Sequence, residues 1–161
     1  YRVSANALDE VTTQGFSAGL NYYFSKYTIN GNYSFNKLIS GDDDPIIPAF
    51  NTPEHKFNLG ISGRDFKLFG SKPAWGFGIN YKWIQGFLFE GSPQFTGFID
   101  DYDLVDAQIS YSTKFKSLKN TTCLFKLGAS NLLNNQVFQV YGGPTVGRLA
   151  YFSVLFEFNN R

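Results

Sequence analysis

Few residues of this chain could carry out bond chemistry. His55 is the single histidine and Cys123 the single cysteine, which excludes an internal disulfide and any cysteine-cluster or histidine-cluster metal site. His55, beside Glu54 at the entrance of a predicted strand, is interpreted as a solvated loop residue. Cys123 lies on the apolar side of its strand, where a free cysteine acts as a small packing residue. We therefore expect no enzymatic activity, no metal site and no bound cofactor.

An acidic run in a long predicted loop offers binding chemistry instead. Asp42, Asp43 and Asp44 carry the oxygen ligands that Ca²⁺ prefers. Three consecutive carboxylates do not all point at one ion without a special turn, so a solvated loop is the favoured interpretation. The run remains a candidate contact for a ligand or a partner.

The loop from 85 to 103 is unusually apolar for a segment predicted to be exposed. Its candidate contact residues are Phe87, Phe89, Phe95 and Phe98. They form either a substrate or partner surface or a packing contact with neighbouring loops, and the sequence leaves both interpretations open.

The segments between the loops alternate between apolar and polar residues, most regularly from 27 to 36. Successive side chains of a strand point to opposite faces of its sheet. One face of the predicted sheet is therefore aromatic and apolar, and the other carries Ser, Asn, Thr and Gly. Because the charges lie mostly between the segments, the pattern predicts an all-β protein, a transmembrane antiparallel β-barrel.

We predict seven or eight strands, with boundaries that carry an error of about two to four residues. They span residues 1–6, 14–24, 27–36, 55–64, 74–84, 104–115, 122–131 and 148–158. All six prolines fall between these segments, because a strand interior needs its backbone N–H groups. Short connections alternate with long ones, as in outer-membrane barrels with short periplasmic turns and long outer loops.

Aromatic residues recur at an interval that matches a membrane. Trp75 and Trp83 are eight residues apart on one face, a separation of roughly 26 Å along the strand and about 20 Å along the membrane normal. The apolar band of an outer-membrane barrel is about 25 Å tall. The same interval separates Phe16 from Phe24 and Tyr27 from Phe35. We expect these six residues to lie at the two lipid interfaces.

The predicted polar face carries small residues and four lysines, Lys56, Lys82, Lys114 and Lys126, with no matching row of carboxylates. Such residues are too small to fill the interior of a closed eight-stranded barrel, which side chains normally occupy. We therefore expect an arc of a larger barrel with a wide lumen. The alternative is a self-contained eight-stranded barrel with a structural or adhesive role.

Composition disfavours two classes of protein and indicates how the chain was produced. No run of 18 apolar residues occurs and mean hydropathy is −0.20, which disfavours membrane-spanning helices. A net charge of +1 disfavours nucleic acid as a partner. The chain lacks methionine and opens in a predicted strand, so we expect a processed chain or a piece of a longer one.

The last strand alternates apolar residues toward the predicted lipid face. These are Phe152, Val154, Phe156 and Phe158, and they resemble the terminal signal that the outer-membrane insertion machinery reads in β-barrels.

Three segments have a distinctive sequence. They are NTPEHKFNLGISG (51–63), GFIDDYDLVDAQISY (97–111) and KLGASNLLNNQVFQVYGGPTVGRLAYFSVLFEF (126–158). Together they resemble the end of a TonB-dependent outer-membrane receptor of the Bacteroidetes type. The most specific element is Asn131-Leu132-Leu133-Asn134, followed by Gly147-Arg148 and the terminal strand.

The resemblance implies that residues 1–161 are the C-terminal portion of a transmembrane barrel of about 22 strands. Its partners are then membrane lipid, an N-terminal plug absent from this sequence, the remaining strands and the TonB complex. The implied role is import of a siderophore, vitamin, glycan or peptide across the bacterial outer membrane. A surface lipoprotein is a further partner that the resemblance leaves open.

Overall fold

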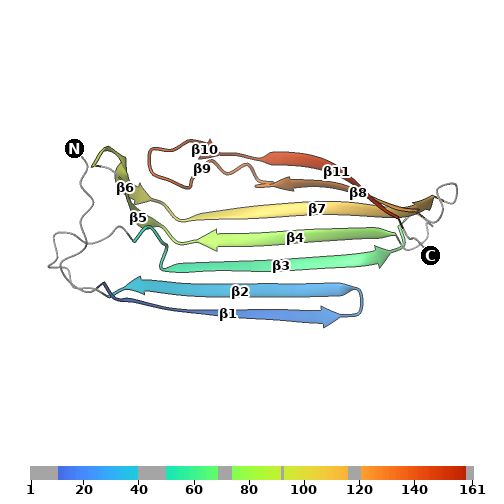
Figure 1. Ribbon diagram of the computed structural model, residues 1–161, viewed down its shortest axis with the longest axis horizontal. Helices are drawn as coiled ribbons and strands as arrows, with labels where there is room; N and C mark the ends of the chain where they lie inside the picture. Colours follow the sequence, from blue (N-terminus) through green and yellow to red (C-terminus); the bar gives the residue numbers. More distant parts are fainter. Residues whose placement is uncertain (1–10, 40–49, 69–73, 92, 116–120, 159–161) are drawn as a thin grey trace.

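The protein is an antiparallel β-sheet protein in the computed structural model, which describes residues 11–39, 50–68, 74–91, 93–115 and 121–158 (Figure 1). Seven long strands form one sheet in the order β1-β2-β3-β4-β7-β8-β11. They are β1 (Thr13–Phe24), β2 (Tyr27–Leu38), β3 (His55–Phe66), β4 (Trp75–Ile84), β7 (Tyr102–Phe115), β8 (Thr121–Ser130) and β11 (Leu149–Glu157). The predicted all-β, antiparallel architecture is confirmed.

The strand register keeps the two kinds of side chain on separate faces. Phe35 lies opposite Phe16 on one side and His55 on the other. Asn58 lies opposite Asn32 and Lys82. This register places aromatic and aliphatic residues of all strands on one face, here called the apolar face. A slip of one residue in any strand would move its side chains to the other face. The opposite face, with its amides, hydroxyls, glycines and lysines, is the polar face.

The connections differ at the two ends of the sheet. At one end, Ser25 and Lys26 form a tight turn between β1 and β2, with Ser25 at φ 52°. At the other end lie the long connections, two of which contain hairpins of their own. These hairpin elements are β5 (Phe87–Glu90), η1 (Pro93–Phe95), β6 (Thr96–Ile99), β9 (Val137–Phe138) and β10 (Thr145–Val146). We call these ends the short-turn end and the long-loop end.

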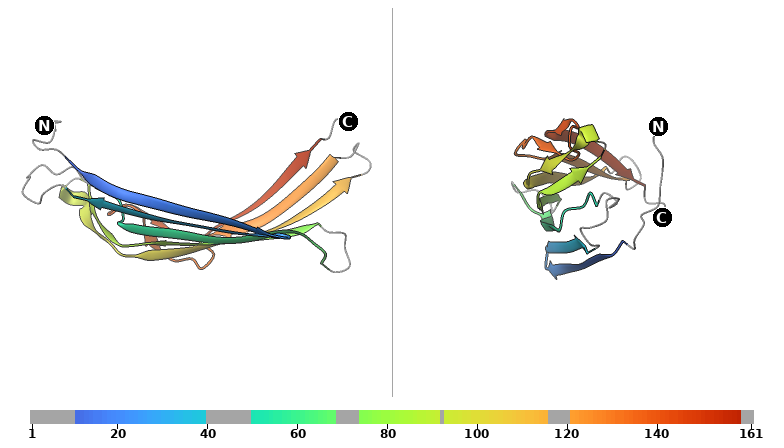
Figure 2. Two further views of the ribbon diagram at one scale, coloured as in Figure 1. Left: turned by 90° about the horizontal axis from the view of Figure 1, so that it is seen from below. Right: turned by 90° about the vertical axis from the view of Figure 1, so that its left-hand side faces the viewer.

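The sheet is open. β1 and β11 are its two edges and do not pair with each other, and Figure 2 shows the seven strands as a curved wall rather than a closed barrel. Apolar residues that are buried include Ile99, Cys123, Ala129 and Val137, none of which marks a central core. The sheet between the two edges is therefore accessible to solvent on both of its faces.

The seven long strands agree closely with prediction, and the strand expected at 1–6 lies outside the described residues. Two hairpins, β5–β6 and β9–β10, were not predicted. Their strands have four and two residues, too few to cross a membrane or to show a long alternation.

The structure agrees with the interpretation of Cys123 and contradicts that of His55. Cys123 is fully buried, opposite Thr113 and Phe156, which agrees with a packing role. The interpretation of His55 as a solvated loop residue is wrong. It begins β3, is half-buried on the apolar face, and its Nδ1 is 2.5 Å from Tyr33 Oη. Its backbone N–H also donates to Gln85 Oε1 at 3.1 Å.

Candidate functional site

The segment after β8 is organised around Asn131, which is 4% exposed and has a left-handed φ of 50°. Its backbone N–H donates to Asp106 Oδ1 at 2.8 Å. Its side-chain Nδ2 donates to the carbonyls of Asn135 at 2.7 Å and Val146 at 3.3 Å, and its Oδ1 accepts from the Asn135 N–H at 2.9 Å. Asparagine tolerates this backbone conformation better than most residues, so one side chain both permits the turn and holds it.

Further hydrogen bonds tie the same segment to β7 and to Arg148, the residue before β11. Asn135 Nδ2 donates to the Asp103 carbonyl at 2.9 Å. The Arg148 N–H donates to Asn134 Oδ1 at 2.9 Å, and its guanidinium donates to the Leu132 carbonyl at 3.3 Å. These contacts give a structural reason for the element Asn131 to Asn134 and for the arginine that follows it. They hold the loop 132–148 against the long-loop end.

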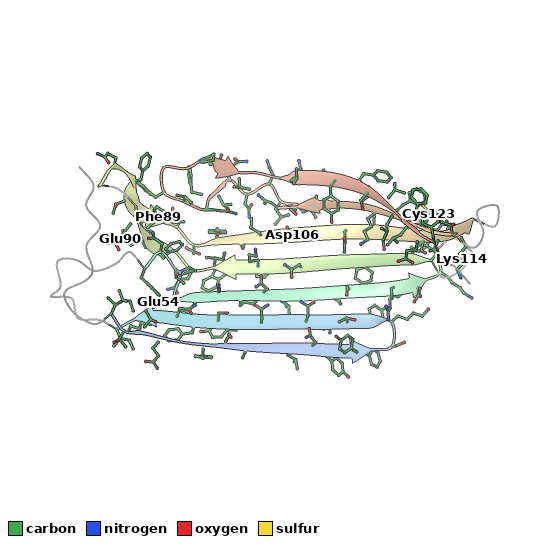
Figure 3. All side chains as sticks on the ribbon, viewed as in Figure 1. Glu54, Phe89, Glu90, Asp106, Lys114 and Cys123 are labelled. Carbon is green, nitrogen blue, oxygen red and sulfur yellow. The ribbon has the colours of Figure 1, made fainter. Side chains whose placement is uncertain are left out.

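The hairpin β5–β6 is held by a side-chain clamp. Asn51 Nδ2 donates to the Glu90 carbonyl at 2.9 Å, while the Glu90 N–H donates to Asn51 Oδ1 at 2.7 Å. An amide side chain thus bonds β5 as a neighbouring strand would. Figure 3 shows Glu54, Phe89 and Glu90 gathered at the long-loop end, and Lys114 and Cys123 at the opposite end.

The two long loops pack against each other. A Cβ added at Gly97 would overlap the ring of Tyr141, so only glycine allows this contact. Gly142 has a φ of 73°, and a Cβ there would lie 2.6 Å from the Phe95 ring. Glycine adopts such a backbone conformation without steric cost. Both glycines are therefore needed for the loops to meet.

A cavity of about 530 Å³ lies where the loops meet. It is lined by Phe98, Ile99, Asp100, Asp101, Tyr102, Gln136, Val137, Phe138, Tyr141 and Gly142. Its volume falls within the range of small-molecule pockets, which combine apolar walls with a few polar groups. The aromatic rings can stack on a ligand, and the carboxylates and Gln136 can form hydrogen bonds with it.

The predicted contact residues of the loop 85–103 lie in different surroundings. Phe98 lines the cavity and is 60% exposed, whereas Phe87 and Phe89 are half-buried in β5. Phe95 packs on Gly142 but stays 51% exposed. Asp42, Asp43 and Asp44 lie outside the described residues. Tyr141 was missed, because its contact with Gly97 joins positions far apart in the sequence.

Rings gather at both ends of the apolar face. At the long-loop end, Phe16 and Phe35 have ring centroids 5.8 Å apart, and Trp83 lies 6.3 Å from Phe57. At the short-turn end Trp75 lies 4.8 Å from Tyr111, and Phe24 is paired with Tyr27. Aliphatic residues fill the middle, among them Leu20, Ile29, Leu59, Ile61, Ile79, Ile109 and Leu127.

The terminal strand continues this face. Phe152, Val154 and Phe156 lie opposite Leu127, Phe125 and Cys123 of β8 and are exposed. Phe158 follows β11 and is 74% exposed.

The polar face is hollowed next to two lysines. A concavity of about 610 Å³ is lined by Ser17, Ala18, Gly19, Asn32, Ser34, Lys56, Asn58, Lys82 and Ile84. It is a second place where a polar solute can be held.

The part of the chain that the structure describes shows neither a metal-binding cluster nor a membrane-spanning helix. No three His, Cys, Asp or Glu side chains gather there to hold an ion. None of these residues forms a helix long and apolar enough to cross a membrane.

A strand-by-strand alternation, an aromatic-banded face and an opposite polar face thus coexist in one curved sheet. The sequence model described as "TonB dependent receptor-like, beta-barrel" matches residues 2–132. The chain belongs to this family. Members of the TonB-dependent receptor family are transporters of the bacterial outer membrane, not enzymes. Neither the curated proteins nor the solved structures contain a match.

Proposed function

We propose that this chain is part of a TonB-dependent receptor that imports a scarce nutrient across the bacterial outer membrane. The observation that carries the proposal is the curved sheet with one aromatic-banded face and one polar face. Lipid requires the first face and an aqueous lumen suits the second. The family match over residues 2–132 supports the same assignment.

The six girdle residues take up the two lipid interfaces in this proposal. Trp83, Phe16 and Phe35 lie at the outer interface, because they share the long-loop end, and Trp75, Phe24 and Tyr27 lie at the periplasmic interface. Aromatic rings with an amphipathic character favour that depth. Phe152, Val154, Phe156 and Phe158 contact lipid and act as the assembly signal.

The parent chain supplies what this sheet lacks. Residues 1–161 form the C-terminal portion of the barrel, and further strands join β1 and β11 to complete about 22. An N-terminal plug occludes the lumen, and the TonB complex drives its release. The parent is of the Bacteroidetes type, and a surface lipoprotein is a further partner at the long-loop end.

The outer cavity contributes to ligand capture. Its aromatic and acidic walls lie between the two hairpin-bearing loops, which meet a solute before the lumen does. The nutrient is of the kind such receptors import, a siderophore, vitamin, glycan or peptide.

Growth and uptake test the proposal. A strain without the full-length receptor should lose growth on at least one scarce nutrient, and the full-length gene should restore it only when TonB is present. The receptor should fractionate with the outer membrane. Unchanged growth on every nutrient, or rescue without TonB, would count against import.

Intact mass separates the proposal from the eight-stranded alternative. A self-contained barrel would have a native mass near 18.1 kDa, whereas the arc requires a parent several times larger. Mass spectrometry of the protein purified from native membranes decides between them.

A further inference from the structure

We infer that Lys56 and Lys82 form an oxyanion subsite on the polar face, which binds a carboxylate or phosphate group of the imported solute. The inference rests on the proposed function, since only an import route brings a solute to this face. The supporting hydroxyl and amide groups come from Ser17, Ser34, Asn32 and Asn58.

The register places the two ammonium groups on one face of neighbouring strands. Lys56 of β3 lies opposite Ile84, and Lys82 of β4 lies opposite Asn58. The lysines are therefore diagonal neighbours, whose backbones are about 7–8 Å apart. Side chains as long as lysine can converge from that distance on one anion.

The surroundings leave room and donors for such a group. Gly19 borders the concavity, and a Cβ there would meet nothing closer than the Gly31 carbonyl at 3.6 Å. Asn58 Nδ2 donates to Asn32 Oδ1 at 2.9 Å, which keeps the Asn32 amide nitrogen as a donor. Ser34 lies opposite Lys56 on β2 and adds a hydroxyl.

The charge around the lysines is uncompensated. Both are half-buried, and neither has an ion-pair partner among the residues that the structure describes. The described carboxylates of the same face, Asp106 and Glu157, lie opposite Asn80 and Thr122, and Asp106 already accepts from the Asn131 N–H. Two partly desolvated cations favour an anion between them, and such charge-assisted hydrogen bonds are the strong ones.

The position favours a solute over a carboxylate of the plug. Lys56 is the second residue of β3, and Lys82 stands two residues before the end of β4. Both lie at the long-loop end, where a solute enters. Lys114 and Lys126 of the same face lie further toward the short-turn end, which makes them matched controls.

Equilibrium dialysis of the purified full-length receptor tests the inference with two probes, citrate for carboxylates and pyrophosphate for phosphates. We expect saturable binding of at least one probe. Lys56→Gln with Lys82→Gln should weaken it about a hundredfold, about tenfold for each lost charged contact. Lys56→Arg with Lys82→Arg keeps both charges, so its affinity for the probe should stay within about threefold of that of the unmodified receptor. Lys114→Gln with Lys126→Gln removes lysines outside the subsite, so its affinity should stay within about twofold.

Contrary outcomes are distinct. Absence of binding by both probes, or equal weakening by both glutamine pairs, overturns the subsite. If the lysines instead pair with the plug, Lys56→Gln with Lys82→Gln lowers the unfolding temperature of the probe-free receptor and no probe binds. These measurements need no TonB, so they can fail while TonB-dependent growth persists, and the proposed function then stands without the subsite.

Discussion

The two ends of the sheet are held together by different interactions. At the short-turn end one lysine makes the main contacts. Lys26 accepts the Arg64 N–H at its carbonyl at 3.1 Å, donates its Nζ to the Asp65 carbonyl at 2.7 Å and lies over the Phe66 ring at 5.9 Å. At the long-loop end, asparagine side chains bond the backbone, with Asn131 and Asn51 as the main examples. The difference agrees with the proposal that one end serves barrel construction, while the other shapes the surface around the outer cavity.

Asn131→Ala tests the long-loop end and is expected to have the largest effect on stability. It removes the side-chain bonds to Asn135 and Val146 and leaves at φ 50° a residue without the polar side chain that makes this conformation tolerable for asparagine. We expect a loss of about 3 kcal/mol in the free energy of unfolding of the full-length receptor, measured by denaturant titration. Asn131→Gly, which keeps the backbone conformation, should lose less. Equal losses would mean that backbone strain contributes nothing and that the lost side-chain bonds account for the whole effect.

Phe156→Asp comes next and tests the lipid face near the short-turn end. Its charge would face hydrocarbon, so we expect a loss of about 2 kcal/mol or less, depending on depth, and reduced surface levels by immunoblot. Leu155→Asp on the polar face is the matched control and should assemble normally. Normal surface levels of Phe156→Asp would contradict the orientation of β11.

Ser25→Gly tests the short-turn end and should raise the free energy of unfolding, by less than Phe156→Asp lowers it. Ser25 holds a φ of 52°, which glycine adopts without cost, so we expect a gain of about 0.5 kcal/mol after the extra chain entropy is subtracted. Ser25→Ala keeps the strain and should show no gain in the same unfolding titration.

Phe98→Ser should have the smallest effect on stability and a clear effect on function. The side chain is 60% exposed at the outer cavity, so stability should change by about 0.5 kcal/mol or less. Uptake of the nutrient identified by the growth screen should fall. Leu88→Ser, also exposed in the same hairpin but outside the cavity lining, should leave uptake unchanged.

More of the sheet than of the candidate site could be predicted from the sequence. Alternation is a local signal, so the long strands, their two faces and the inward lysines could be read directly from the chain. The cavity depends on contacts such as Tyr141 with Gly97 and Phe95 with Gly142, which join two loops and leave no periodic trace. His55 was misread because the local pair with Glu54 hid its place opposite Phe35.

The free edges of β1 and β11 carry a consequence for the order of events in assembly. Each edge presents backbone N–H and C=O groups that no neighbour among the described residues bonds. Hydrocarbon offers such groups no substitute partner, and leaving each unsatisfied costs several kcal/mol. In the proposed barrel, entry into the bilayer and closure of the ring must therefore proceed together, because β1 and β11 need neighbouring strands before this sheet can exist in lipid.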